Sequence, residues 1–507
     1  MRCEKAGIAC KGYHRDTVFV NRTPGNPSTT ALSVLKRSVD YYNCLEDQPK
    51  GFAAHLEGLK THLLVGPRTR YRLQALELLK RLYLPQPTPA NIKKSSLFSW
   101  LPIVCELQGE SQALDYCLLT FCVIQVAVSN PGSPCVDESL QVYNDALQKL
   151  RVEIEDAGSG QSDEILAAIS VLSTCELFVY PTDLSWRAHA QGIREILRIR
   201  SCTDASSTTV WQSFCTRIRI VLLLEALSRR RAPSTTFPQC HQLASTLSKE
   251  QYDSLHALID VAWEVPVLLE EMDQLTSSCN TTMPVNGHAR EDLLKPSLAV
   301  LEKLYERQER YKVEKGTSLL YWAVPSSVDN PTDDGGPKLF PFALQFESLE
   351  TACHMILWWA IVLQVLGSMI DLHEHFFGTS ATATTTTPTT LPSTSDSKVA
   401  RARGPESESE SESGPLLFSY SESSPTSISS IVEQADKLAR YICQSIEYCY
   451  QLENGIIGPQ LTAYAQWVTK LYFRRFRRDR ELAWCSNIKN MRGPGFRHGI
   501  ELMGFQD

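Results

Sequence analysis

Hydrophobic side chains recur at helical spacing along most of this chain. Segment 68–84 ends at Pro85 and places four leucines near one face, namely Leu73, Leu76, Leu79 and Leu82. Segment 111–129 is apolar on nearly all sides and is followed by Asn130-Pro131-Gly132. A period of three to four residues predicts a helix with one buried face, and an all-round apolar segment predicts a helix in the core.

Four more helices are predicted between residues 135 and 229. Segment 135–155 is amphipathic through Leu140, Tyr143, Leu147 and Leu150. Ser162 or Asp163 can cap a helix that runs through Tyr180 and ends at Pro181. The apolar face of segment 186–200 comprises Ile193, Ile196 and Leu197, with His189 beside them. The apolar face of segment 210–229 comprises Trp211, Phe214, Ile218, Val221 and Leu222. Short connections predict antiparallel neighbours, and so an all-α array of helices.

The second half continues this pattern with one compositional break. Two or three helices are expected over 240–320, a Pro/Gly/Asp-rich loop over 325–345, and helices over 429–453 and 457–485. Segment 376–428 contains a run of threonines and an alternation of Glu and Ser. Such a segment buries too little apolar surface to offset its ordering entropy, so we expect it to be disordered.

One apolar segment, 353–370, has about the minimum length for crossing a membrane. It contains His354 and Gln364 and lacks a basic flank. These features favour a buried core helix, and we expect no membrane partner.

Composition predicts a globular intracellular protein. The 507 residues are 43% hydrophobic and 21% charged, which is enough to build a large core. The net charge of −7 disfavours a surface that wraps nucleic acid, although residues 1–23 carry five basic and two acidic side chains. The sixteen cysteines are scattered, mostly in apolar helical segments, which predicts reduced buried thiols, as at Cys117, Cys122, Cys175 and Cys443.

The first fifteen residues, MRCEKAGIACKGYHR, contain a motif of two cysteines among basic residues. Cys3, Cys10 and the following Gly12-Tyr13 resemble the end of the zinc binuclear cluster of fungal transcription factors, which often reads Cys-x-K-A-G-x-x-C-x-G-Y. The resemblance implies that Cys3 and Cys10 are the fifth and sixth cysteines of a six-cysteine, two-zinc cluster. It also implies that the basic residues contact the DNA backbone, namely Arg2, Lys5, Lys11 and Arg15.

The chain departs from this family because four of the six cysteines and the basic DNA-reading helix are absent from it. Two thiolates cannot complete a tetrahedral zinc shell. Zinc and DNA binding are therefore expected only for a complete form with the upstream cysteines. Either the natural start lies upstream of Met1, or the protein is a regulator without its DNA-binding module. A third interpretation treats Cys3 and Cys10 as incidental thiols of a frayed terminus.

A second resemblance covers the helical body. The regulatory domain of the same family shows a helix ending in E-L-F, then W-x-x-H-x-x-G-x-x-x-L-L-x-x-R, then a helix ending near A-L-x-x-R-R. The matching residues here are Glu176-Leu177-Phe178, Trp186, His189, Gly192, Ile196, Leu197, Arg200, Ala226-Leu227 and Arg229-Arg230-Arg231. Trp186 and His189 are therefore candidate regulatory-core positions, with a hydrogen-bonded core histidine favoured over a ligand-binding or pH-sensing one.

These resemblances divide the chain into a cluster remnant (1–15), a linker (16–30), a helical regulatory domain (31–375), the disordered insert (376–428) and C-terminal helices of the regulatory domain (429–507). They imply a nuclear regulator of RNA polymerase II genes, with metabolic or biosynthetic genes as candidates. The implied partners are DNA, the transcription machinery, a small-molecule effector and a second copy of the chain. Segment 16–50 shows no sustained heptads, which weakens the case for a homodimer. The alternative is a helical interaction protein that does not bind DNA and acts through a partner or a small molecule.

Other candidate sites carry weaker signals. Arg474, Arg475, Arg477 and Arg478 form the densest basic run, which is either a nuclear-import signal or a solvated helix face. His373-Glu374-His375 is not expected to bind metal, because alternate residues on a helix diverge. A solvated helix end is the favoured interpretation of these three residues. The acidic-hydrophobic stretch 406–422 has the composition of an activation segment or of a plain solvated loop. No phosphate loop, nucleophile elbow or Cys-x-x-Cys pair occurs in the sequence, so we expect no enzyme.

Overall fold

The computed structural model describes residues 49–86, 97–129, 135–156, 162–179, 183–200, 209–232, 247, 252–278, 287–316, 319–332, 335–378 and 427–497. All of these belong to one compact unit, Pro49–Asp507. The predicted cluster remnant and linker lie outside the described residues, as do Cys3, Cys10 and the neighbouring basic side chains. Most of the predicted insert also lies outside them, between a helix that ends at Phe377 and one that begins at Ile428.

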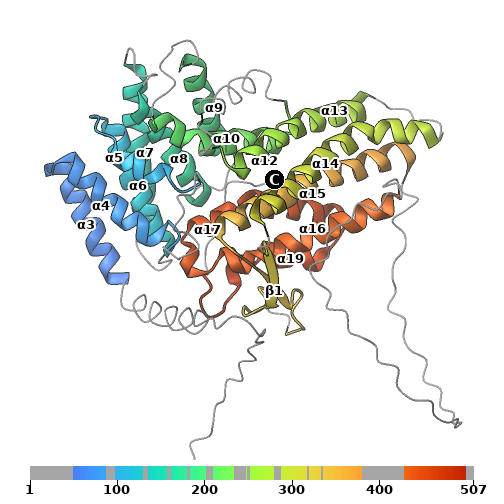
Figure 1. Ribbon diagram of the computed structural model, residues 1–507. Helices are drawn as coiled ribbons and strands as arrows, with labels where there is room; N and C mark the ends of the chain where they lie inside the picture. The colour runs from blue at the N-terminus through green and yellow to red at the C-terminus, as the bar shows by residue number, and fades with distance from the viewer. Residues whose placement is uncertain are drawn as a thin grey trace, which may run out of the picture. The chain divides into compact units, whose positions relative to one another are not determined.

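The fold is all-α, with one two-stranded sheet. The first group of helices, called here the N-terminal helix group, comprises α3 (Pro49–Val65), α4 (Arg68–Leu82), α5 (Trp100–Glu106), α6 (Gln112–Ser129), α7 (Cys135–Glu155), α8 (Asp163–Val179) and α9 (Asp183–Arg200). Helix α6 is its centre, because α3, α4, α7 and α8 all pack against it (Figure 1). Every residue from Ala113 to Ala127 except Tyr116 is buried, as the apolar pattern predicts.

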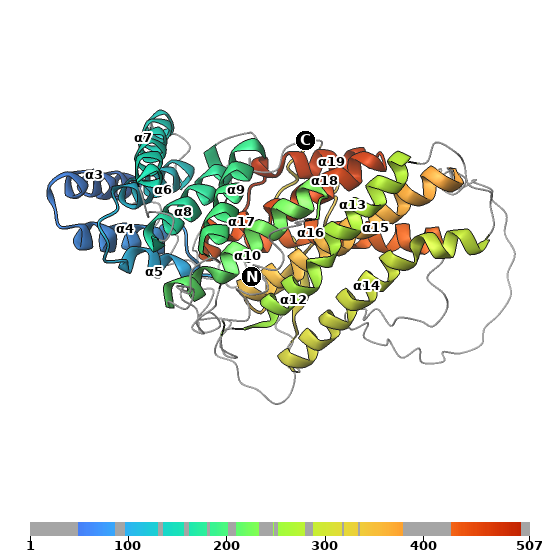
Figure 2. The same ribbon diagram turned by 90° about the horizontal axis from the view of Figure 1, so that it is seen from above.

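The second group, called here the C-terminal helix group, comprises α12 (Ser254–Ala262), α13 (Glu264–Ser278), α14 (Gly287–Lys315), α15 (Leu349–Phe377), α16 (Ile428–Cys449), η2 (Leu452–Asn454), α17 (Ile457–Leu461), α18 (Ala463–Arg475), α19 (Asp479–Ser486) and η3 (Ile488–Asn490). Helix α10 (Thr209–Arg229) packs against α5, α8 and α9 and also against α12 and α13, so it joins the two groups (Figure 2).

Helix α15 is the core of the C-terminal helix group. It runs beside α14 and α16 and also contacts α12, α13 and α18 (Figures 1 and 2). Every residue from Thr351 to Ile370 except Gly367 is buried. Gln364 within this buried stretch has partners on other helices: it donates Nε2–H to the Leu227 carbonyl oxygen at 3.0 Å and accepts a hydrogen bond from the Tyr464 hydroxyl.

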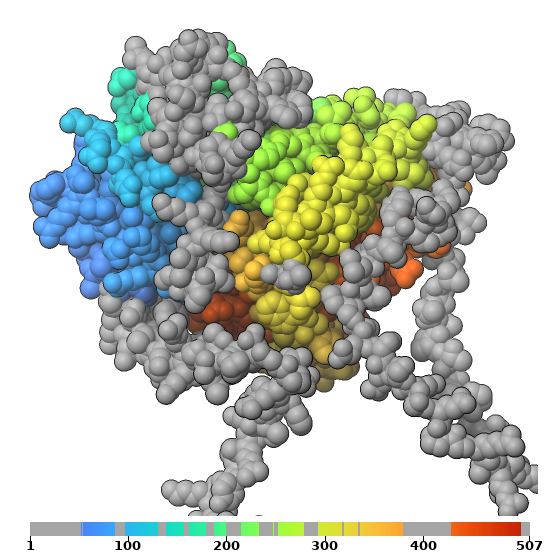
Figure 3. All heavy atoms as spheres, in the orientation of Figure 1, coloured from blue at the N-terminus to red at the C-terminus, as the bar shows by residue number. Residues whose placement is uncertain are grey.

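Two helices, α6 and α15, are long and apolar enough to cross a membrane by length and composition. The sequence had pointed to the α15 segment alone. In both helices most of the apolar window is buried by other helices of the fold. Helix α14, by contrast, lies at the surface on the face shown in Figure 3, and charged residues such as Lys303, Glu309 and Arg310 are exposed along it. Lys312 pairs there with Glu309 at 2.6 Å.

The strands are the main element that the sequence did not predict. β1 (Tyr321–Pro325) and β2 (Phe342–Phe346) pair antiparallel, with Tyr321 opposite Phe346. The two strands lie at the two ends of segment 325–345, which was expected to be a loop. The sheet is anchored by aromatic contacts, because Trp359 of α15 lies 5.4 Å from Tyr321 and 6.2 Å from Phe346 between ring centroids.

The stretch 457–485, which was predicted to be helical, is not one continuous helix. Three helices, α17, α18 and α19, occupy it. Arg477 has a φ of +50°, and Arg478 N–H donates to the Phe473 carbonyl oxygen at 2.9 Å, which ends α18. Before α17, Gly455 has a φ of +63° and lies against the end of α4. A Cβ at Gly455 would be 2.3 Å from the Tyr83 carbonyl oxygen, so a side chain cannot be accommodated there.

Candidate functional site

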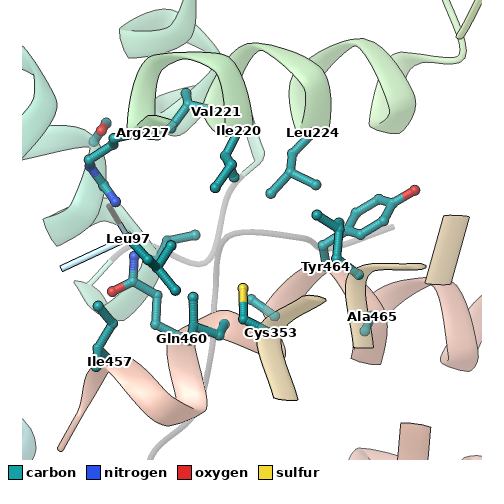
Figure 4. Close-up of a pocket in the computed structure, with 15 residues that line it drawn as sticks. Leu97, Arg217, Ile220, Val221, Leu224, Cys353, Ile457, Gln460, Tyr464 and Ala465 are labelled. Carbon is teal, nitrogen blue, oxygen red and sulfur yellow. The ribbon is translucent and has the colours of Figure 1, made fainter. Parts of the chain in front are cut away.

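A cavity of about 100 Å³ lies where the two helix groups meet (Figure 4). Its walls come from α8, α10, α15, α17 and α18, with Leu97 at one side. Most of the lining is aliphatic, including Leu177, Ile220, Leu224, Leu357 and Ile457. Because these residues lie far apart in the sequence, the cavity exists only when the two groups pack together.

Arg217 supplies the positive charge of this cavity. Its side chain extends from α10 toward Leu97 and Gln460 (Figure 4). One Nη2–H is donated to the Thr174 hydroxyl, and the guanidinium carbon lies 4.7 Å from the centroid of the Trp100 ring. No acceptor among the described residues pairs with the buried Nε–H. Burial lowers the pKa of Arg217 from its usual range.

The remaining polar groups of the lining are neutral. Gln460 accepts a hydrogen bond from the Tyr83 hydroxyl at 2.6 Å. The Tyr464 hydroxyl donates to Gln364. Burial raises the pKa of the Cys353 thiol to about 12, so this side chain stays protonated at physiological pH. The cavity therefore presents one cation in apolar surroundings.

A second polar cluster contains His189. The imidazole Nε2 lies 3.2 Å from the Tyr143 hydroxyl and 3.2 Å from Glu176 Oε1, and the Tyr143 hydroxyl donates to the same carboxylate. Glu176 is only 2% exposed. His189 is a hydrogen-bonded histidine at the interface of α7, α8 and α9, which was the favoured interpretation of this position.

Three residues of the body motif, Glu176, His189 and Gly192, lie at the interface between α8 and α9. Glu176 and His189 face each other across it, and a Cβ on Gly192 would lie 3.8 Å from the Ile169 side chain. Trp186 lies in α9, but its side chain is outside the described residues. The motif residues described here thus serve helix packing.

The basic run at the end of α18 is exposed, and part of it is ion-paired. Arg475 Nε lies 2.7 Å from Asp371 Oδ1, and its Nη2 contacts Glu374. Arg478 Nε lies 3.6 Å from Asp436 Oδ1. The left-handed conformation of Arg477 turns the chain at the end of the helix, so these arginines do not share one uninterrupted helix face.

The histidines of α15 do not converge on a common site. His373 is buried at the end of α15, with its ring centroid 5.2 Å from that of Phe377, whereas His375 is exposed. The expected solvated face at this position is therefore wrong for His373. His354 stacks on Tyr311 at 3.7 Å between ring centroids, and burial lowers its pKa to about 3. Within the described ranges, no group of three or more His, Cys, Asp or Glu side chains is placed to hold a metal ion.

The cysteines whose side chains the structure describes are buried free thiols, including Cys117, Cys122, Cys175 and Cys443. Cys443 lies 3.4 Å from Cys485 between sulfur atoms without a disulfide bond. No protein-family model matches the chain, and no curated protein or solved structure matches it.

The sequence reasoning missed Arg217. Its signal was the pair of arginines, Arg217 and Arg219, inside the otherwise apolar run that forms α10. A cation in such a run must find a buried partner or a ligand. Arg219 has such a partner, because its Nη2 pairs with Asp260 and its Nη1 lies 2.7 Å from His256 Nδ1.

Proposed function

We propose that this chain is the regulatory body of a nuclear transcription regulator, and that its helices respond to a bound effector. The observation that carries the proposal is the meeting of the motif residues Glu176, His189 and Gly192 at one helix interface. A pattern of residues that pack together supports a shared architecture more strongly than the same pattern scattered over a surface would. The family resemblance then connects that architecture with transcription.

DNA binding in this proposal belongs to the complete form with six cysteines. Cys3 and Cys10 would supply two of the thiolates that hold two zinc ions. Arg2, Lys5, Lys11 and Arg15 would contact phosphates beside the base-reading helix. The exposed basic run of Arg474, Arg475, Arg477 and Arg478 is the candidate for a nuclear-import signal.

The test compares the 507-residue chain with a longer form that includes the residues encoded by the upstream reading frame. We expect the extended form to hold about two equivalents of zinc and to be retained on DNA at low salt. Cys10→Ser should abolish both properties, and Cys44→Ser, which lies outside the motif, should leave both intact. The proposal would be refuted if the extended protein holds no zinc, or if zinc-loaded protein is not retained on DNA.

The alternative function is a helical interaction protein that never binds DNA. The cavity at Arg217 favours it, because this cavity lies in the helical body and needs no DNA-binding module to take a ligand. A fluorescent fusion that stays outside the nucleus, together with zinc-free extended protein, would establish this alternative.

A further inference from the structure

We propose that the cavity at Arg217 binds a small monocarboxylic acid, with the carboxylate on the guanidinium and the apolar body among the aliphatic side chains. This inference names the class of effector and rests on the proposed function only for its regulatory meaning. The binding itself follows from charge, shape and lining.

The charge argument begins with the neighbours of Arg217. Three buried arginines each pair with a carboxylate: Arg72 with Asp115 and Glu164, Arg219 with Asp260, and Arg307 with Glu314. No carboxylate among the described residues pairs with the partly buried Arg217, whose contacts are a neutral hydroxyl and an aromatic face. A cation in apolar surroundings without a counter-ion is costly, and an anion entering the cavity would reduce that cost.

The donors of Arg217 fit a carboxylate. A guanidinium has five N–H donors in a planar fork, and Thr174 takes one of them. The Nε–H has no acceptor among the described residues. Arginine binds carboxylates through two parallel N–H bonds, which lysine cannot reproduce.

The remaining lining restricts the ligand to one charge. Figure 4 shows Arg217 at one end of the cavity and Leu224 and Tyr464 toward the other. A second anionic group would lie among Ile220, Leu224 and Leu357 without a cation. Dicarboxylates and phosphate esters are disfavoured for this reason.

The volume limits the size of the ligand. An apolar cavity of roughly 150 Å³ accommodates benzene, so a cavity of about 100 Å³ takes a smaller molecule. A short aliphatic acid fits within this limit. Propionate is a suitable probe, and propionamide is its neutral isostere.

Titration calorimetry on the full chain tests the inference without DNA. We expect propionate to bind, and propionamide and the dianion succinate to bind at least tenfold more weakly. Arg217→Gln should weaken propionate binding by about 10- to 100-fold, the effect of losing hydrogen bonds to a charged group. Arg198→Gln is the matched control. Arg198 is 67% exposed on α9, so this variant should bind propionate like the parent chain.

A second variant guards against a folding defect in Arg217→Gln. Leu224→Phe narrows the cavity and keeps the guanidinium, so it should also lose propionate binding while retaining the helical circular dichroism of the parent chain. The inference is overturned if folded parent protein does not bind propionate, if propionamide binds equally well, or if folded Arg217→Gln binds like the parent. Propionate binding by protein that fails the DNA and zinc tests would reject the proposed function and leave this site intact.

Discussion

Replacing Arg72 by methionine should destabilise the N-terminal helix group more than any surface change. Arg72 is 1% exposed on α4 and joins three elements. Its Nε donates to Asp115 of α6 at 2.7 Å, and its Nη1 donates to Glu164 of α8 at 2.8 Å and to the Leu107 carbonyl oxygen at 2.6 Å. Methionine fills a similar volume but leaves two largely buried carboxylates without this cation.

The expected magnitude follows from removing one member of a buried charged network. Breaking a buried ion pair on one side costs about 3–5 kcal/mol, because the remaining charge keeps its desolvation penalty. Arg68 moderates the loss, since its Nε lies 3.2 Å from the other oxygen of Asp115. We therefore expect a loss near the lower end, about 3 kcal/mol, in the free energy of unfolding at pH 7.

The effect should depend on pH. Burial already raises the pKa of Asp115, although Arg72 and Arg68 oppose this shift. Without the guanidinium this pKa rises further. A carboxyl group with a raised folded-state pKa stabilises the fold at low pH and loses that contribution as the pH rises through the folded value. The difference between the parent and Arg72→Met should therefore shrink between pH 7 and pH 5.

Urea unfolding followed by circular dichroism at both pH values measures this difference. Arg68→Met is the control, because Arg68 is 38% exposed and its loss should cost less than about 1 kcal/mol. Equal losses for the two variants would refute the reasoning, as would a loss in Arg72→Met that does not change with pH.

Three further substitutions test individual contacts by the same unfolding measurement. Gly455→Ala should cost about 1–3 kcal/mol, because a Cβ collides with a carbonyl oxygen at the end of α4, and unchanged stability would contradict the tight approach. His189→Leu should cost about 1–3 kcal/mol by leaving the buried Glu176 carboxylate with fewer partners, and the double variant with Glu176→Leu should recover part of this loss. Arg475→Ala should cost less than about 1 kcal/mol, since its pair with Asp371 is solvent-exposed, and a larger loss would show that the pair is structural.

Helices with a regular apolar period were predictable, and their buried faces were predictable in part. The segments that became α6, α7 and α8 match the predicted segments closely because tertiary packing follows the same period as the sequence. Individual leucines were less certain. Leu73 is 50% exposed, whereas Leu79 is fully buried, because the buried face of α4 follows Tyr71, Ala75 and Leu79 rather than a strict three-residue repeat.

Elements fixed by distant contacts were not predictable from local pattern. β1 and β2 are five residues each, and their positions depend on Trp359 of α15 and on each other. The breaks around α17 arise where the chain approaches the end of α4, as the hydrogen bond from Ile456 N–H to the Leu82 carbonyl oxygen shows. Such contacts join residues more than 370 positions apart, which no local window contains.

The two candidate sites differ in the same way. Glu176 and His189 were locatable because they are 13 positions apart on consecutive helices with recognisable spacing. The cavity was not locatable, since its lining runs from Leu97 to Ala465. Only the unusual arginines of α10 hinted at it.

Helix α8 connects these two sites physically. Glu176 faces His189 on α9, whereas Ser173 and Leu177 line the cavity and Thr174 accepts a hydrogen bond from Arg217. Successive residues of a helix project about 100° apart, so one helix can present both faces within a single turn. A ligand that displaced α8 would therefore alter the Tyr143–Glu176–His189 contacts, and a change in those contacts would alter ligand affinity by the same free energy. This reciprocity makes α8 the element through which the cavity and the motif interface would influence each other.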